Sequence, residues 1–120
     1  MPPVLEEQLR LIDGVPALIS YVDSEQRYQF ANKGYEEWFG HSREEVRGKH
    51  LREILGQDAY ESIRPHVKEA LRGKKVSFAT WLDYKGAGQR HVQINYVPHL
   101  DERGDTLGFL AFILDLTEWD

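Results

Sequence analysis

The sequence of 120 residues contains no cysteine, which excludes disulfides, thiolate nucleophiles and cysteine-ligated metals. No apolar run approaches the roughly 18 residues of a membrane span, and the N-terminus has no signal-peptide pattern. We therefore expect a cytoplasmic domain without membrane insertion. Basic residues are outnumbered, because 15 Lys and Arg against 20 Asp and Glu give a formal net charge of −5. This balance argues against a nucleic-acid partner, since nucleic-acid-binding surfaces are normally basic.

The motifs of common catalytic sites are also missing. There is no glycine-rich phosphate loop, no nucleophile elbow and no carboxylate pair that the fold would bring together. His41, His50, His91 and His99 fall in loops or on strand faces, and none of these four has a second histidine or carboxylate at metal-binding spacing on a helix, so we expect no metal site. We expect a non-catalytic chain. A small pocket enzyme is the rival class, and it would need a buried ionisable pair; Asp83 would face inward only if its strand were flipped.

The pattern of apolar residues predicts one domain, residues 15–120, preceded by a helix at residues 1–14. Apolar side chains near helical spacing stop at Gly14 and Pro16, where a helix should end. The domain then opens with a predicted hairpin, whose two strands run from 17 to 22 and from 27 to 31.

Helical signals dominate the middle of the chain. Asn32 is a good N-cap for a short helix at 33–39. The S-x-x-E sequence of residues 42–45 matches a capping box. Another short helix is predicted at 51–55 and one long helix at 58–72. The long helix carries a single apolar stripe, formed by Tyr60, Ile63, Val67, Ala70 and Leu71.

From residue 75 the period of the apolar pattern changes from 3.6 to 2. Three strands are predicted, at 76–84, 89–97 and 107–116, and turn-forming residues join them. Strands and helices kept apart in this way indicate an α+β fold with an antiparallel sheet.

The last predicted strand is apolar on both faces: Phe109, Ala111 and Ile113 lie on one, and Leu110, Phe112 and Leu114 on the other. A half-buried antiparallel strand would alternate with polar residues, so both faces should be covered. One face should pack on the short helices. The other needs the N-terminal helix, through Leu9 and Ile12, or a second subunit, and the pattern leaves both alternatives open.

Segments at both ends of this pattern resemble a known family. Residues 30–40 read FANKGYEEWFG and residues 42–49 read SREEVRGK, which is similar to the early helical segment of PAS domains. Residues 104–118 end in DLTE and resemble the last strand of that family with its closing D-x-T-E sequence. The resemblance covers residues 12–118 and agrees with the order of strands and helices.

The resemblance implies a PAS fold, in which a five-stranded antiparallel sheet and short helices on one face enclose a central pocket. PAS domains are sensory and dimerisation modules, usually parts of bacterial signalling proteins such as sensor histidine kinases. We therefore expect a fragment of such a protein that forms a homodimer and acts on an output domain outside this chain. Asp115 and Thr117 would be the signal-transmitting pair, with a structural cap on the sheet as their alternative role.

Known cofactors of the family can be compared with the residues present. Flavin photosensors need a cysteine where Leu51 stands here, so their photochemistry is excluded. Haem-binding members use a histidine on the long helix. His66 lies on that helix, but about a turn later than the usual ligand and at the edge of the apolar stripe. A partly exposed surface histidine is the alternative interpretation, and the cofactor stays unidentified.

Strand alternation, together with the register of the family, predicts which residues face the pocket and could bind a ligand. They are Tyr35, Trp38, Phe39, Phe78, Val92, Ile94, Tyr96, Phe109, Ala111 and Ile113. Trp81 lies on the opposite face of the strand from Phe78 and is a candidate for the dimer interface. An aromatic lining suits a small planar or apolar ligand. The alternative is that these side chains fill the core, which would leave a ligand-free interaction module.

Overall fold

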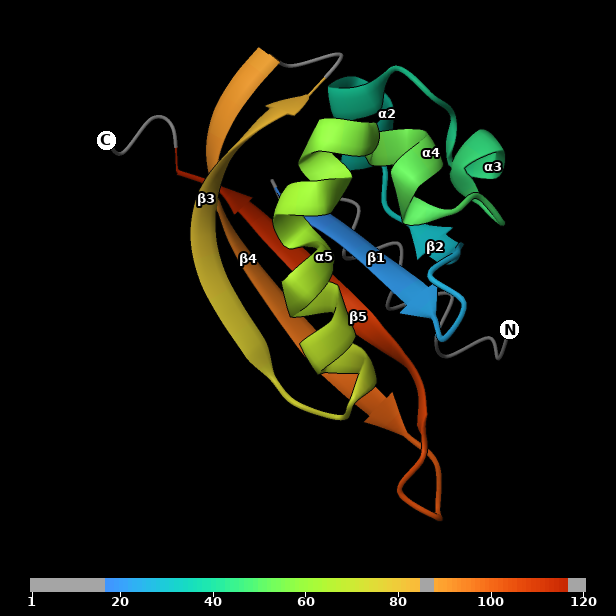
Figure 1. Cartoon of the computed structure of the whole chain (residues 1–120). Helices are drawn as coiled ribbons and strands as arrows, with labels where there is room; N and C mark the ends of the chain where they lie inside the picture. The colour runs from blue at the N-terminus through green and yellow to red at the C-terminus, as the bar shows by residue number, and fades with distance from the viewer. Residues whose placement is uncertain (1–16, 85–87, 117–120) are drawn as a thin grey trace.

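The structure, a computed structural model, describes residues 17–84 and 88–116. The described chain forms a five-stranded antiparallel sheet with helices on one face (Figure 1), as the sequence predicts. The predicted helix at 1–14 lies outside the described residues. In chain order the elements are β1 (Ala17–Asp23), β2 (Tyr28–Ala31), α2 (Gly34–Phe39), α3 (Arg43–Val46), α4 (Leu51–Leu55), α5 (Gln57–Leu71), β3 (Val76–Tyr84), β4 (Gly88–Leu100) and β5 (Thr106–Asp115).

The strand order β2-β1-β5-β4-β3 puts the last strand in the centre of the sheet. β5 pairs with β1 on one side and with β4 on the other, both antiparallel. Ala111 is the partner of Ser20 on β1 and of Tyr96 on β4. Because side chains opposite one another share a face of the sheet, these three residues form a row across three strands.

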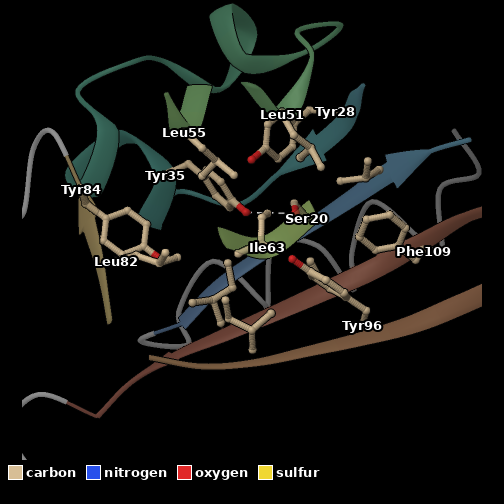
Figure 2. A pocket seen from close by; sticks show the side chains of 14 residues that line it. Ser20, Tyr28, Tyr35, Leu51, Leu55, Ile63, Leu82, Tyr84, Tyr96 and Phe109 are labelled. Carbon is tan, nitrogen blue, oxygen red and sulfur yellow. Dashed lines mark hydrogen bonds between the residues drawn. The ribbon is translucent and has the colours of Figure 1, made fainter. Parts of the chain in front are cut away.

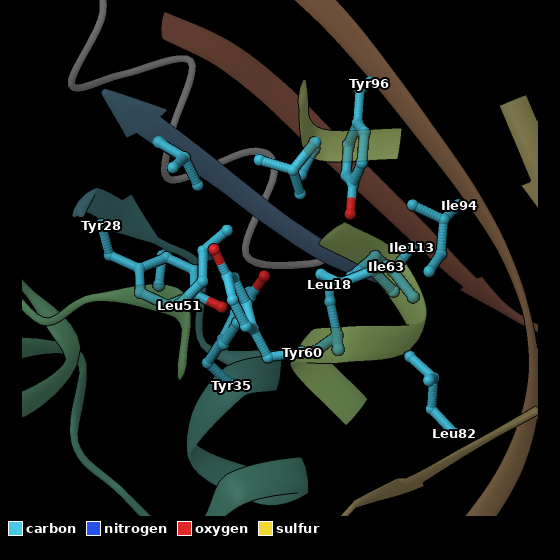
Figure 3. Close-up of a cluster of buried hydrophobic side chains, with 14 of the residues drawn as sticks. Leu18, Tyr28, Tyr35, Leu51, Tyr60, Ile63, Leu82, Ile94, Tyr96 and Ile113 are labelled. Atoms are coloured by element: carbon cyan, nitrogen blue, oxygen red, sulfur yellow. The ribbon is translucent and has the colours of Figure 1, made fainter. Parts of the chain in front are cut away.

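The long helix α5 lies across the inner face of the sheet, and the short helices gather beyond one end of it (Figure 1). Its buried residues Tyr60, Ile63, Val67 and Ala70 are four of the five predicted stripe residues. They pack into one core with side chains from all five strands (Figure 3). Pro65 lies inside the helix on its exposed side. None of the helices in the described ranges is long and apolar enough to cross a membrane.

Two of the predicted helix caps have different outcomes. The capping box of Ser42 and Glu45 is present, as predicted. The prediction that Asn32 is an N-cap is wrong, because α2 begins after Lys33 without a side-chain cap. Asn32 is fully buried; it accepts a hydrogen bond from the Ile19 backbone N–H at 3.1 Å and donates one to the Ala17 carbonyl at 2.7 Å. Burial forces its amide to satisfy β1 instead of a helix end.

The two faces of the sheet differ in how far they are covered. The inner residues of β5, from Phe109 to Ile113, are buried, whereas Leu110 and Leu114 on the outer face are 37% and 43% exposed. The third strand has the same asymmetry, since Leu82 is buried and Trp81 is 50% exposed. Within the described residues, the centre of the inner face is covered, the first half of β3 is half-buried on that face, and large apolar side chains of the outer face are left exposed.

Candidate functional site

A small cavity lies between the inner face of the sheet and the helices (Figure 2). Its volume is about 20 Å³, which is space for about one water molecule. Nine of its fourteen lining residues are apolar. The other five are polar but uncharged: Ser20, Tyr28, Tyr35, Tyr84 and Tyr96.

The four tyrosines reach the cavity from four different elements. Tyr28 belongs to β2, Tyr35 to the first turn of α2, Tyr84 to the end of β3 and Tyr96 to β4. On the strands, the period of two places Tyr84 two residues after Leu82 and Tyr96 two residues after Ile94, all on the inner face. Figure 2 shows the tyrosine hydroxyls turned toward the same space. Residues far apart in the sequence therefore bring their polar ends together.

The hydroxyls differ in their hydrogen bonds. Tyr35 donates to the Ser20 hydroxyl at 3.0 Å. The Tyr84 hydroxyl is buried and has no partner, and it is the one side-chain polar atom of this kind in the part of the chain that the structure describes. A buried polar group without a partner is uncommon in native proteins, where such groups usually serve a purpose or contact water.

Burial raises the pKa of all four tyrosines above the ordinary value of 10.0, so each is a neutral phenol at physiological pH. It raises the pKa of Tyr35 to about 12, with hydrogen bonds to Ser20 and Tyr28 acting in the opposite direction. Burial also raises the pKa of Tyr28, Tyr84 and Tyr96 above the ordinary tyrosine value. The wall therefore offers neutral O–H donors and apolar surface, a combination suited to binding an uncharged molecule.

Six of the ten residues predicted to face the pocket line this cavity: Tyr35, Ile94, Tyr96, Phe109, Ala111 and Ile113. The other four lie in or at the edge of the core, outside the cavity wall. Trp38 packs edge-on against Tyr84 at 4.8 Å between ring centroids, and Phe39 stacks on Tyr35 at 5.3 Å. Phe78 stacks on His66, and Val92 is fully buried in the core.

Sequence reasoning missed eight lining residues, of which Ser20 and Tyr84 bear on the chemistry. A signal for both was present. Ser20 lies two residues from Leu18 and from Val22, so it shares a face of the strand with these apolar residues. Tyr84 is separated from Phe78 by an even number of positions, so it lies on the face that was taken as inward on the third strand. Extending the alternation to the end of each strand would have placed both on the inner face.

His66 does not face the cavity. Its ring stacks flat on Phe78, with centroids 3.7 Å apart and an interplanar angle of 11°. The cavity wall contains no histidine, so these residues do not fit a haem held there by an axial ligand. Across the described ranges, no group of three or more possible metal ligands gathers.

Asp115, the residue expected to transmit the signal, ends β5. Its Oδ2 lies 3.3 Å from Nη1 of Arg90 on β4. The Arg90 guanidinium also lies 6.0 Å from the centre of the Trp38 ring, which contacts Tyr84. Asp115 is thus connected to the cavity wall through two side chains. Thr117, the second member of the expected pair, lies outside the described residues.

A family model described as the PAS fold matches residues 12–119. The chain belongs to this family. It is a PAS sensory domain, in agreement with the resemblance in its sequence. A search among curated proteins finds no match.

Solved structures with the same fold come from several bacteria. A PAS domain from Colwellia psychrerythraea has a TM-score of 0.77 at 23% identity, covering 96% of this chain and 98% of that one. The PAS domain of Bordetella pertussis BvgS has a TM-score of 0.65 at 26% identity, covering 95% and 86%. The Vibrio cholerae VqmA dimer has a TM-score of 0.79 at 21% identity, covering 95% of this chain and 52% of VqmA. The chain therefore spans about half the length of VqmA.

Proposed function

We propose that this PAS domain is the ligand-sensing module of a bacterial signal-transduction protein such as a sensor histidine kinase. It binds a small uncharged molecule in the cavity and passes the bound state through β5 to an output domain outside this chain. The observation that carries the proposal is the convergence of four tyrosine hydroxyls, from four elements, on one cavity. Convergent polar groups in an apolar enclosure are typical of small-molecule sites.

The route to the output domain is the end of β5. Asp115 and Thr117 act as the relay in this proposal. Support comes from the contacts that lead from Tyr84 through the Trp38 ring and the Arg90 guanidinium to the Asp115 carboxylate. A ligand bound beside Tyr84 would alter the packing of the Trp38 ring that holds Arg90, and with it the ion pair at the strand end.

Two solved structures of similar fold, one bound to a ligand and one a receptor, support a sensing role. One solved structure is that of VqmA bound to DPO, with a TM-score of 0.79 and 20% identity to this chain. Another is an RNA-binding light-oxygen-voltage receptor, with a TM-score of 0.78 and 19% identity. These likenesses concern the fold, and we apply their sensing role to this domain as part of the proposal.

The proposal includes a homodimer formed through the outer face of the sheet. Its central residues are Leu110, Phe112 and Leu114, with Leu9 and Ile12 from the N-terminal segment. Leu110 and Leu114 are large apolar side chains left more than a third exposed, and a contiguous apolar surface of this kind favours association. The domain itself is non-catalytic and cytoplasmic in this proposal, and contacts neither nucleic acid nor membrane.

A ligand-free dimerisation module is the second candidate, and one observation favours it. A cavity of about 20 Å³ holds no molecule larger than about one water until lining side chains move. In this candidate the tyrosines complete the core, and the signal passes through the outer face alone.

Native mass spectrometry of freshly purified protein distinguishes the two candidates. Sensing predicts a dimer that carries a bound small molecule. Ala111→Val, which adds two methyl groups at the cavity wall, should remove that molecule and leave the dimer intact. Ala79→Val, on the exposed side of β3, is the control and should retain it. An empty wild-type dimer would favour the ligand-free module.

A further inference from the structure

The buried hydroxyl of Tyr84 is a hydrogen-bond donor that is available to a ligand. Tyr84 is 2% exposed, and its hydroxyl is turned toward the interior of the cavity (Figure 2). The described residues supply it with no hydrogen-bond partner. Leaving a buried donor unsatisfied destabilises the folded state, so a structural role alone does not account for a tyrosine here. A phenylalanine would fill the same space without the unpaired group.

The position of this hydroxyl is fixed before any ligand arrives. The Tyr84 ring is held by two edge contacts, with the Trp38 centroid at 4.8 Å and the Phe39 centroid at 5.2 Å. The neighbouring Tyr35 hydroxyl already donates to Ser20. A donor that needs no reorientation on binding lowers the entropy cost of association.

The charge of the ligand follows from the cavity wall. None of the fourteen lining residues is Asp, Glu, Lys, Arg or His. An ion entering this space would lose its hydration without meeting an opposite charge, which is strongly unfavourable. An uncharged molecule with one acceptor atom would satisfy the phenol instead, since a phenol donates a hydrogen bond more strongly than it accepts one.

We propose that Tyr84 determines ligand specificity, by donating a hydrogen bond to a carbonyl oxygen or ring nitrogen of a small, planar, uncharged ligand. This inference rests on the proposed sensing function. The cavity has space for about one water molecule. The acceptor atom of the ligand occupies that space, and the apolar part of the ligand displaces lining side chains. Leu55, half-buried on the five-residue helix α4, lies at the edge of the cavity where displacement is easiest.

Three probes of nearly equal shape test the inference. Acetophenone is uncharged and has a carbonyl acceptor. Isopropenylbenzene replaces that oxygen with a methylene group, and benzoate keeps the acceptor but carries a charge. Affinities come from titrations followed by backbone amide chemical shifts. We expect wild type to bind acetophenone about tenfold more tightly than either other probe, a difference typical of one buried hydrogen bond.

Tyr84→Phe is the decisive variant. It should lose about tenfold in affinity for acetophenone and keep its affinity for isopropenylbenzene, because only the hydroxyl is removed. Its denaturation midpoint should equal or exceed that of wild type. The matched control Tyr35→Phe breaks the bond to Ser20, so its midpoint should fall while the wild-type preference for the ketone persists.

The outcomes separate the inference from the function on which it rests. Equal binding of ketone and alkene to wild type, or an unchanged ketone affinity in Tyr84→Phe, would overturn the inference and leave sensing intact. A lowered midpoint in Tyr84→Phe would give the hydroxyl a structural role and overturn it as well. If wild type binds neither ketone nor alkene, the inference fails, and the sensing function is then judged separately by whether native mass spectrometry finds a bound small molecule.

Discussion

The inner and outer faces of β5 belong to one strand of ten residues and have opposite properties. Inward, Phe109, Ala111 and Ile113 are closed over by helices and enclose a cavity with neutral hydroxyls. Outward, Leu110 and Leu114 are large apolar side chains with more than a third of their surface exposed. One central strand thus carries a finished core on one side and an uncovered apolar surface on the other. A displacement of the strand would move side chains on both faces, as the proposed link between the cavity and a dimer interface requires.

The largest expected effect is a difference in stability between variants at two adjacent residues of this strand, Phe109 and Leu110. Phe109→Ala should lower the free energy of unfolding by about 3–5 kcal/mol, because it removes a buried aromatic ring and enlarges the cavity that this ring lines. Leu110→Ala should change the free energy of unfolding of the monomer by less than about 0.5 kcal/mol, as is usual for surface positions. Urea denaturation measures both. Similar losses for the two variants would mean that the outer face is as well packed as the inner one.

The next prediction concerns association. Phe112→Glu places a charge in the centre of the outer apolar face, and a buried charge without a partner is unfavourable. We expect a monomer by light scattering, or an N-terminal segment with reduced protection in hydrogen exchange. Thr80→Glu, a half-buried position on the inner side of β3, is the control and should not change the oligomeric state. If Phe112→Glu is still a dimer and its N-terminal segment is as well protected as in wild type, the proposed interface is wrong.

A smaller effect is expected at the strand end. Asp115→Ala breaks the ion pair with Arg90, in which both side chains are partly exposed, so its cost should be below about 1 kcal/mol. The fold should persist while ligand binding no longer changes the activity of an attached output domain. Arg90→Ala should reproduce this uncoupling. If Asp115→Ala unfolds the domain, the residue is a structural cap on the sheet.

The smallest expected effect is a pH dependence of the free energy of unfolding, which arises from His50 at the start of α4. His50 accepts a hydrogen bond from the Arg52 backbone N–H at the start of α4, and only a neutral imidazole can accept it. Partial burial, followed by the charges of Arg52 and Arg27, lowers the pKa of His50 below its usual 6.5. Its contribution to stability is therefore present above pH 6.5 and is lost as the pH falls through the lowered folded-state pKa.

A denaturation series across this pH range tests the point. His50→Asn keeps an N-cap acceptor and removes the titration, so its stability should vary less with pH below 6.5. An equal loss of stability in the variant and in wild type would assign the pH dependence to other groups.

Much of the fold was predictable because its signals are local. The capping box at Ser42, the strand periods after residue 75 and the stop signals at glycines each depend on a few neighbouring residues, and the structure agrees with them. Asn32 shows where this reasoning fails. Its sequence context is that of an N-cap, but its burial beside β1 gave the side chain two backbone partners from another strand, and no local pattern contains that contact.

The sequence by itself determined the order of the elements, the family, and which residues of each strand share a face, because alternation and caps are properties of short segments. Only the tertiary structure decided which side chains enclose the cavity. Tyr84 and Tyr35 lie 49 positions apart in the chain, and their convergence depends on sheet order and on how α2 packs against β1. It also decided that the Tyr84 hydroxyl is buried without a partner, since burial is a property of everything that surrounds a group.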